Sequence, residues 1–271
     1  EYGNVPEYTY IAGTESDISP VKPQILESRI KRAHSLIWAS GKRDPLTAFD
    51  EWSKLLFAKV IDERTTPTNQ PRGFQVGTNE TIAAVSNRVH ELFVRACRRD
   101  PSIFPEGTRI SLNDKKLYEV VKCLQDISIT RTDIDSIGIA FENFFGSVFR
   151  GELGQYFTMR PLARFTVAFL DVTHEDYVID PTAGSGGFLL EALLQVWHSI
   201  GRTFSGQPQS EIDREKMDFA LVKIYGVEIH EILARICKIN LLLHHDGHTN
   251  IEGDRSCPDS AFSCPRLNPP V

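Results

Sequence analysis

An acid followed by a glycine-rich turn is the feature of this sequence best suited to hold a small ligand. Asp180 follows the apolar residues Val178 and Ile179, and the turn at 181–187 leads directly into helix-forming residues. This order predicts a strand, a tight turn and a helix, the place where a doubly wound α/β sheet holds a nucleotide-like ligand. A second acid, Glu228, ends another apolar run. A carboxylate at the end of a strand can accept hydrogen bonds from both hydroxyls of a ribose.

The charge of Asp180 bears on which ligand fits. In a dinucleotide site, backbone N–H groups and a helix N-terminus face a pyrophosphate, so an acid beside the turn is unfavourable there. S-adenosylmethionine has a sulfonium and an ammonium group and no phosphate, so it would tolerate the acid. From these residues alone, a dinucleotide, S-adenosylmethionine and a merely structural glycine turn all stay open.

Five short motifs occur in order along the second half of the chain. They are Gly154-Gln155-Tyr156-Phe157-Thr158, Asp180 to Phe188, Gly226-Val227-Glu228, Gly253-Asp254 and Asn268-Pro269-Pro270. This ordered set resembles that of N6-adenine DNA methyltransferases, in particular the modification (M) subunit of type I restriction-modification systems and its fused single-chain relatives. The resemblance implies a site-specific DNA methyltransferase that transfers a methyl group from S-adenosylmethionine to adenine N6, as part of a restriction-modification system.

The resemblance also implies which residues bind the cofactor. Residues 155–160 would fold over its methionine end, with Met159 where the family has proline. Asp180 and the turn at 185–187 would meet the amino acid and the ribose. Glu228 would bind the ribose hydroxyls, and Asp254 the adenine amino group. The expected cofactor contacts are Gln155, Tyr156, Phe157, Thr158, Met159, Arg160, Asp180, Thr182, Ser185, Gly186, Gly187, Glu228 and Asp254.

By the same resemblance, Asn268, Pro269 and Pro270 are the catalytic residues. The exocyclic amine of adenine is a poor nucleophile because its lone pair is delocalised into the ring. Hydrogen bonds from this amine to the Asn268 side-chain oxygen and the Pro269 carbonyl would direct the lone pair at the methyl group. The prolines would hold that turn rigidly. The adenine must be flipped out of the duplex to reach such a pocket.

Two features depart from the family pattern. Val271 stands where the family has Tyr or Phe to stack on the flipped base, and the loss of an aromatic stack removes about 1 to 3 kcal/mol per base. The sequence also ends at the fourth expected strand, which would leave an open sheet edge. We therefore expect a methyltransferase domain that is incomplete at its C-terminus, a chain that is part of a longer protein, and no methylation by this chain alone.

Other classes of function stand beside this one. A protein glutamine methyltransferase can share the Asn-Pro-Pro turn because an amide nitrogen poses the same chemical problem, whereas the motif at 154–158 favours DNA. A non-catalytic cofactor-binding or scaffolding fragment of a restriction-modification complex would agree with Val271. A cytosine-carbon methyltransferase needs a cysteine nucleophile after a proline, and Cys257 and Cys264 instead precede prolines. A dinucleotide oxidoreductase is the remaining alternative.

The distribution of charge differs from that of a self-sufficient DNA binder, which usually has a basic footprint. Residues 1–150 hold 20 basic and 20 acidic side chains and residues 151–271 hold 10 and 16, so the second part carries the net charge of -6. Either a partner subunit or a missing segment binds the double-stranded DNA, or local clusters do. By resemblance, the expected partners are a specificity subunit and a restriction subunit, unless a missing portion fuses those roles. The candidate clusters, which solvated helix faces also explain, are Lys31-Arg32, Lys42-Arg43 and Arg95, Arg98, Arg99.

Composition excludes several other classes of protein. No apolar run approaches the roughly 20 residues of a membrane span, and no signal peptide opens the sequence, so we expect a cytoplasmic protein without membrane contact. The five cysteines are scattered and predict neither a disulfide framework nor a zinc site. The histidine-rich segment at 244–248 is typical of a helix end rather than of a metal site.

The apolar periodicity predicts an α/β fold in three parts, namely an irregular N-terminal arm at 1–24, an all-α domain at 25–150 and a domain at 151–271 in which strands alternate with helices around a parallel sheet. The resemblance implies that this last domain is a Rossmann-like S-adenosylmethionine-dependent methyltransferase domain. Helices of the all-α domain are expected at 25–38, 45–63, 80–98, 113–127 and 133–149. In the methyltransferase domain, strands are expected at 177–179, 224–227 and 250–251, and helices at 160–170, 188–199, 212–221 and 229–244.

Overall fold

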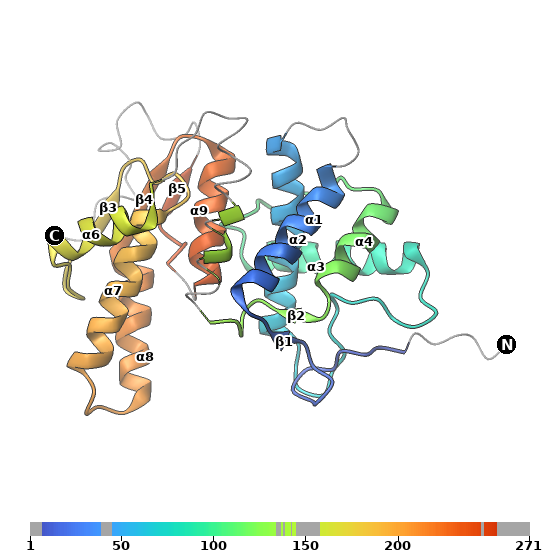
Figure 1. Ribbon diagram of the computed structural model, residues 1–271, viewed down its shortest axis with the longest axis horizontal. Helices are drawn as coiled ribbons and strands as arrows, with labels where there is room; N and C mark the ends of the chain where they lie inside the picture. The colour runs from blue at the N-terminus through green and yellow to red at the C-terminus, as the bar shows by residue number, and fades with distance from the viewer. Residues whose placement is uncertain are drawn as a thin grey trace. The chain divides into compact units, whose positions relative to one another are not determined.

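The computed structural model describes residues 7–38, 45–133, 137, 139–141, 143, 144, 158–244 and 247–253. The chain divides into two compact units, Glu1–Gln155 and Tyr156–Val271. Figure 1 shows the elements of both units with the labels used below.

Helices α1 to α4 form most of the described part of the first unit (Figure 1). They are α1 Pro23–Trp38, α2 Pro45–Thr65, α3 Ile82–Arg99 and α4 Asp114–Leu124, and all four lie close to their predicted ranges. The starts of the last two have a local cause. The Thr81 hydroxyl accepts a hydrogen bond from the Ala84 N–H (3.2 Å), and the Asn113 side chain accepts one from the Lys116 N–H (3.0 Å).

The described part of the first unit also contains two short strands, which the prediction of an all-α domain did not include. Strand β1, Ser19–Pro20, pairs in parallel with β2, Ile127–Ser128. On α2, the buried carboxylate of Glu63 accepts hydrogen bonds from the backbone N–H groups of Ile129 (3.0 Å) and Thr130 (2.9 Å), which holds the chain after β2 against this helix. Two-residue strands that are distant in sequence have no periodicity to detect, which explains why the pattern missed them.

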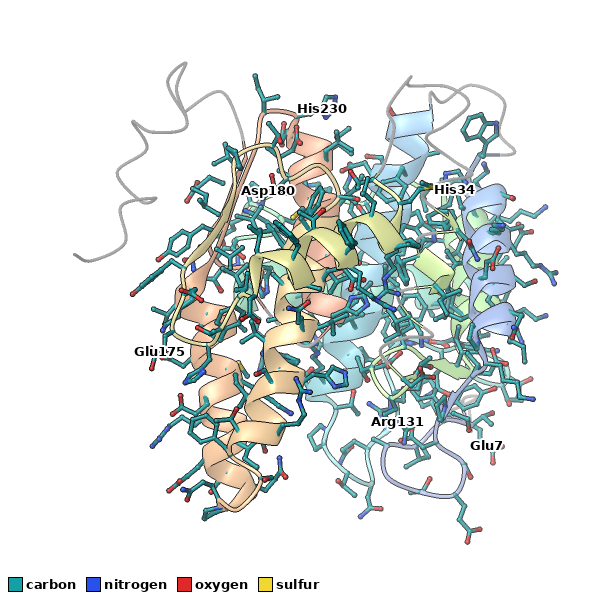
Figure 2. The ribbon with its side chains drawn as sticks, turned by 60° about the vertical axis from the view of Figure 1, so that its left-hand side comes forward. Glu7, His34, Arg131, Glu175, Asp180 and His230 are labelled. Carbon is teal, nitrogen blue, oxygen red and sulfur yellow. The ribbon has the colours of Figure 1, made fainter. Side chains whose placement is uncertain are left out.

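The segment before α1 packs against the loop that precedes α3. Isolated β-bridges join Glu7 to Thr78 and Ile11 to Pro71. The buried carboxylate of Asp17 forms ion pairs with Arg72 (2.9 Å) and with Arg131 (3.2 Å), and Figure 2 labels Glu7 and Arg131 in this region. These contacts hold the described part of a segment in which the sequence predicts no regular structure.

The second unit is a helix-rich α/β unit, as predicted, with a parallel sheet in the order β3-β4-β5 (Figure 1). The strands are β3 Val178–Asp180, β4 Ile224–Glu228 and β5 Ile251–Gly253. Between β3 and β4 the chain forms α7 Gly187–Thr203, α8 Gln209–Asp218 and a π-helix, η1 Phe219–Lys223. Helix α9, Glu231–Leu243, joins β4 to β5. Parallel strands joined by helical crossovers place all strand ends of one kind at one edge of the sheet.

Helices α7 and α9 pack on this sheet and bury its core. The core side chains include Leu189, Leu193, Ile224, Leu241 and Ile251. Gly226 lies at the tightest contact, because a Cβ there would stand 2.8 Å from Leu189 Cδ1 and 2.9 Å from Ile251 Cδ1. A glycine at this position therefore lets the helix α7 approach the middle strand closely.

Helix α6, Arg160–Leu170, begins and ends as predicted and packs against α7. Its buried residues are Ala163 and Val167, whereas Phe165 and Phe169 stack on each other with their rings exposed. No helix among the residues that the structure describes is long and apolar enough to cross a membrane.

Candidate cofactor-binding site

The glycine-rich turn lies at the carboxyl end of β3, and the predicted order of strand, turn and helix is confirmed. The Thr182 N–H donates a hydrogen bond to Asp180 Oδ1 (3.0 Å), and the Gly186 N–H donates one to the Ala183 carbonyl (2.7 Å). Gly184 and Gly186 have φ angles of +54° and +82°, a region that side chains with a Cβ disfavour. Helix α7 begins directly after the turn. Its first N–H groups therefore lie at the ligand-binding end of the sheet.

Gly186 is required for a second reason, which lies in α9. A Cβ at this position would stand 2.7 Å from the Sγ atom of Cys237, a fully buried residue. Burial raises the pKa of the Cys237 thiol, and the negative charges of Asp180 and Glu228 raise it further. The thiol is therefore neutral, and the carboxylates of Asp180 and Glu228 lie close enough to Cys237 to raise its pKa.

The carboxylate of Glu228 connects the end of β4 to the glycine turn. Its Oε2 accepts a hydrogen bond from the Gly184 N–H (2.9 Å), and its Oε1 accepts one from the His230 N–H (2.8 Å). Only 8% of the residue is exposed. Since a carboxylate has about four lone-pair sites, each oxygen retains capacity to accept a further hydrogen bond. Figure 2 labels Asp180 and His230 at this end of the sheet.

Asn240 on α9 also supports the turn, and sequence reasoning missed it. Its side-chain Nδ2 donates a hydrogen bond to the Ser185 carbonyl (3.0 Å). Its backbone carbonyl oxygen lies 2.7 Å from Nδ1 of the buried His244. Asn240 is buried within a run of apolar residues, between Ile239 and Leu241. A buried amide in such a run needs a hydrogen-bonding partner, and that was the available signal.

Three of the predicted contacts, Thr158, Met159 and Arg160, lie at the start of α6 or just before it. Thr158 and Met159 are exposed, Met159 at 67%, and Met159 is the residue at the N-cap position, without a side-chain hydrogen bond. The Arg160 side chain forms an ion pair with Glu191 of α7 (2.7 Å), a residue with only 4% exposure. Arg164 reaches the other oxygen of the same carboxylate (3.3 Å). This ion pair holds the beginning of α6 on α7, the helix that follows the glycine turn.

The described structure thus brings one group of predicted contacts together at the ends of β3 and β4. This group consists of Asp180, Thr182, Ser185, Gly186, Gly187 and Glu228. Seven other predicted site residues lie outside the described residues, and their roles stay predictions. They are Gln155, Tyr156, Phe157, Asp254, Asn268, Pro269 and Pro270.

A parallel sheet with a glycine turn after one strand and an acid at the end of the next defines a class of α/β domains that bind nucleotide-like ligands. Within that class, the family model described as N-6 DNA Methylase matches residues 132–263. The resemblance predicted from the five motifs is thereby confirmed. The chain is related to the N6-adenine DNA methyltransferases of restriction-modification systems.

Individual relatives agree with this family. The type I restriction enzyme StySPI methylase subunit of Salmonella potsdam is 32% identical over 223 residues, which are 76% of this chain and 40% of the relative. The type II restriction enzyme and methyltransferase RM.BcgI of Heyndrickxia coagulans is 29% identical over 127 residues, 46% of this chain and 18% of the relative. This chain therefore spans less than half the length of these two relatives.

A solved structure agrees with the fold. The methyltransferase subunit of a type I restriction-modification system from Streptococcus thermophilus aligns with a TM-score of 0.52, over 89% of this chain and 61% of that one. At 16% identity this likeness concerns the fold alone.

Proposed function

We propose that this chain forms the cofactor-binding and catalytic part of an S-adenosylmethionine-dependent DNA methyltransferase that acts on adenine N6 in a restriction-modification system. The observation that carries the proposal is the hydrogen bond between the Gly184 N–H and Glu228 Oε2, 44 residues apart. It joins two motifs of the family into one site at the carboxyl end of a parallel sheet. The match to the N-6 DNA Methylase family supports the same function.

The charge of the site fits S-adenosylmethionine better than a dinucleotide. Two carboxylates, of Asp180 and Glu228, lie near the turn, where a pyrophosphate would meet like charge. In the proposed Rossmann-like domain, Asp180 would attract the ammonium group, and Glu228 would accept hydrogen bonds from the ribose hydroxyls. The bound cofactor supplies an electrophilic methyl group. Residues 155–160 would fold over its methionine end, and Asp254 would bind its adenine amino group.

Catalysis would consist of positioning and electrostatics. The Asn268 side-chain oxygen and the Pro269 carbonyl would accept hydrogen bonds from the amino group of a flipped adenine and so orient its lone pair. Pro269 and Pro270 would keep that turn rigid. The chain would act on double-stranded DNA together with specificity and restriction subunits, because several relatives are methylase subunits of type I restriction enzymes.

A second candidate is a part that binds the cofactor without transferring the methyl group. The observation that favours it is Val271, which stands where an aromatic residue would stack on the flipped base. Transfer of tritium from methyl-labelled S-adenosylmethionine to duplex DNA, measured with the chain assembled with its proposed specificity and restriction subunits, distinguishes the two candidates, since only the first predicts labelled DNA.

Calorimetric titration with S-adenosylmethionine, with NADH as the comparison ligand, tests the cofactor. We expect saturable binding of S-adenosylmethionine and no binding of NADH. Binding of NADH, or failure to bind S-adenosylmethionine, would contradict the proposal.

A further inference from the structure

Among the described arginines of the first unit, the structure distinguishes two sets that the sequence does not separate. Members of the first set are ion-paired with acids. Arg29 pairs with Asp126 at 2.8 Å, Arg72 with Asp17 at 2.9 Å and Arg88 with Glu80 at 2.6 Å; Arg131 also pairs with Asp17. These arginines connect elements of the fold, and each lies against an acid, with Asp17 shared by Arg72 and Arg131.

The second set comprises Arg95, Arg98 and Arg99 on α3 and Arg109 in the loop that follows it. All four are exposed, and within the described ranges none forms an ion pair. Of the three basic clusters in the sequence, this is the one whose members are all described and all without an ion pair among the described residues; Arg32 of the first cluster is also exposed and has no ion pair there. Lys31 pairs with Glu27 at 2.6 Å, and Lys42 and Arg43 lie outside the described residues.

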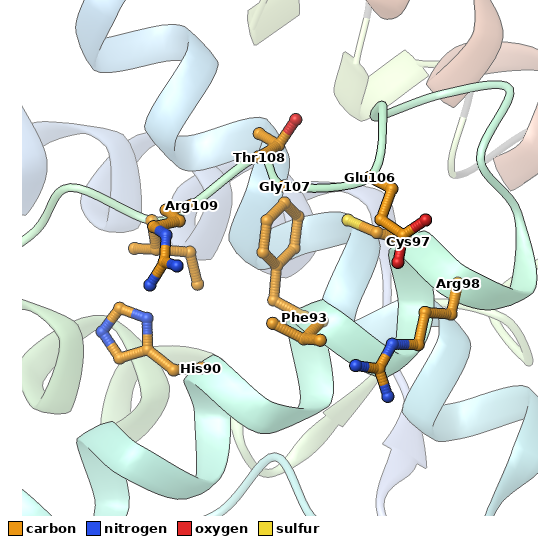
Figure 3. Close-up of a pocket in the computed structure, with 10 residues that line it drawn as sticks. His90, Phe93, Cys97, Arg98, Glu106, Gly107, Thr108 and Arg109 are labelled. Atoms are coloured by element: carbon orange, nitrogen blue, oxygen red, sulfur yellow. The ribbon is translucent and has the colours of Figure 1, made fainter.

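The four arginines surround two hollows beside α3. Positions 95, 98 and 99 lie on one face of the helix because they are three and four residues apart. A hollow of about 540 Å³ is lined by Arg98, Arg109 and His90, among other residues. Figure 3 shows Arg109 and His90 on one side of Phe93 and Arg98 on the other. A second hollow, of about 420 Å³, is lined by Arg95 and Arg99, among others. Two concave surfaces with basic rims therefore adjoin the same helix.

The acids nearby leave this surface with an excess of positive charge. Glu106 lines the first hollow and Asp62 the second. The Asp62 carboxylate is occupied, because it accepts hydrogen bonds from the backbone N–H groups of Gly73 and Phe74 at 3.0 Å each. Glu91 is exposed on α3, one turn before Arg95. Asp100, the residue after Arg99, is half-buried, and its Oδ1 accepts hydrogen bonds from the N–H and the hydroxyl of Ser102. Four guanidinium groups thus face three carboxylates outside the core, those of Glu91, Asp100 and Glu106.

The helix dipole explains only part of this arrangement. Cations in the last turn of a helix are stabilised by its carbonyl end, which accounts for Arg98 and Arg99. Arg109 lies outside the helix and yet lines the same hollow as Arg98. A shared ligand explains both positions. Guanidinium groups match phosphate in geometry and bind it through two parallel N–H···O bonds.

We propose that Arg95, Arg98, Arg99 and Arg109, here named the arginine surface, bind the phosphate backbone of double-stranded DNA. The inference rests on the proposed function, which supplies DNA as the partner, and it assigns a DNA contact to a unit that contains none of the predicted cofactor or catalytic contacts except Gln155. Because the whole chain has a net charge of -6, a local basic surface is the part that can offset repulsion by the duplex.

The salt dependence of DNA binding tests the arginine surface. A labelled duplex is titrated with the full chain by fluorescence anisotropy at 50 and 200 mM salt. Each phosphate contact should weaken binding about 3.5-fold over this fourfold change in salt, from a slope of about 0.9 per contact. A variant with Arg95→Gln, Arg98→Gln and Arg109→Gln should bind more weakly at 50 mM salt and with a slope lower by about 0.9 per lost contact.

Arg202→Gln is the matched control. Arg202 is exposed in the last turn of α7, and it has no ion pair among the described residues. We expect this variant to keep the wild-type slope. An unchanged slope in the triple variant, an equal loss in Arg202→Gln, or wild-type chain that does not bind DNA would overturn the inference. Circular dichroism checks that the variants are folded. Titration of the same variants with S-adenosylmethionine separates this result from a failure of the proposed function, since the arginine surface lies outside the cofactor site.

Discussion

Replacement of Glu228 by glutamine tests whether this carboxylate binds the ribose or only supports the turn. In the structure each oxygen accepts one backbone N–H, from Gly184 at 2.9 Å and from His230 at 2.8 Å. In Glu228→Gln the amide oxygen can keep one of these bonds, and the amide NH2 group, a donor, faces the other N–H. Because His230 is exposed, its N–H can bind water instead. We therefore expect the oxygen to stay with Gly184 and the loss of stability to be about 1 to 2 kcal/mol.

The loss of affinity should exceed what this small structural change explains. The carboxylate oxygens are also the proposed acceptors for two ribose hydroxyls, and removal of such acceptors costs about 1 to 3 kcal/mol. Binding of S-adenosylmethionine to Glu228→Gln should accordingly weaken by about 5-fold to 150-fold. Isothermal titration calorimetry measures the affinity, and urea unfolding of the same samples measures the stability.

Glu231→Gln is the matched control for this experiment. Glu231 is an exposed acid in the first turn of α9 and pairs with Arg235 at the surface. An exposed ion pair contributes about 0 to 1 kcal/mol, so the control should change stability little and affinity not at all. If Glu228→Gln is less stable but binds S-adenosylmethionine like the wild type, Glu228 supports the turn and does not contact the ribose. Our assignment of its role would then be refuted.

Three further substitutions follow from the site. Gly186→Ala should destabilise the chain by at least about 1 kcal/mol, because alanine disfavours a positive φ and its Cβ would stand 2.7 Å from Cys237 Sγ; an unchanged melting temperature would contradict this. Asn240→Ala should weaken binding of S-adenosylmethionine by removing the hydrogen bond to the Ser185 carbonyl, and equal titrations would exclude a positioning role. Asn268→Ala in an active protein should abolish methylation of duplex DNA and leave cofactor affinity nearly intact, so methylation at the wild-type rate would remove Asn268 from the mechanism.

Local features of the second unit were predictable from the sequence because their causes are local. Helix α6 has its predicted bounds, and β3 is displaced by one residue from the prediction at 177–179. Apolar spacing, the glycine turn and the alternation of strands and helices are properties of short segments, and they also determine a parallel sheet. The prediction at 212–221 is less accurate, because the chain forms α8 and then the separate π-helix η1 there.

The sequence by itself determined the strand, turn and helix at 178–203, the order of the motifs and hence the relationship to DNA methyltransferases. Tertiary structure alone decided which side chains are committed to the fold. It brought the Glu228 carboxylate to the Gly184 N–H and the Asn240 side chain to the Ser185 carbonyl, and it paired β1 with β2. It also separated paired arginines from those of the arginine surface. The physical reason is that propensity and periodicity act over a few residues, whereas a hydrogen bond or an ion pair depends on which distant groups folding brings within about 3 Å of each other.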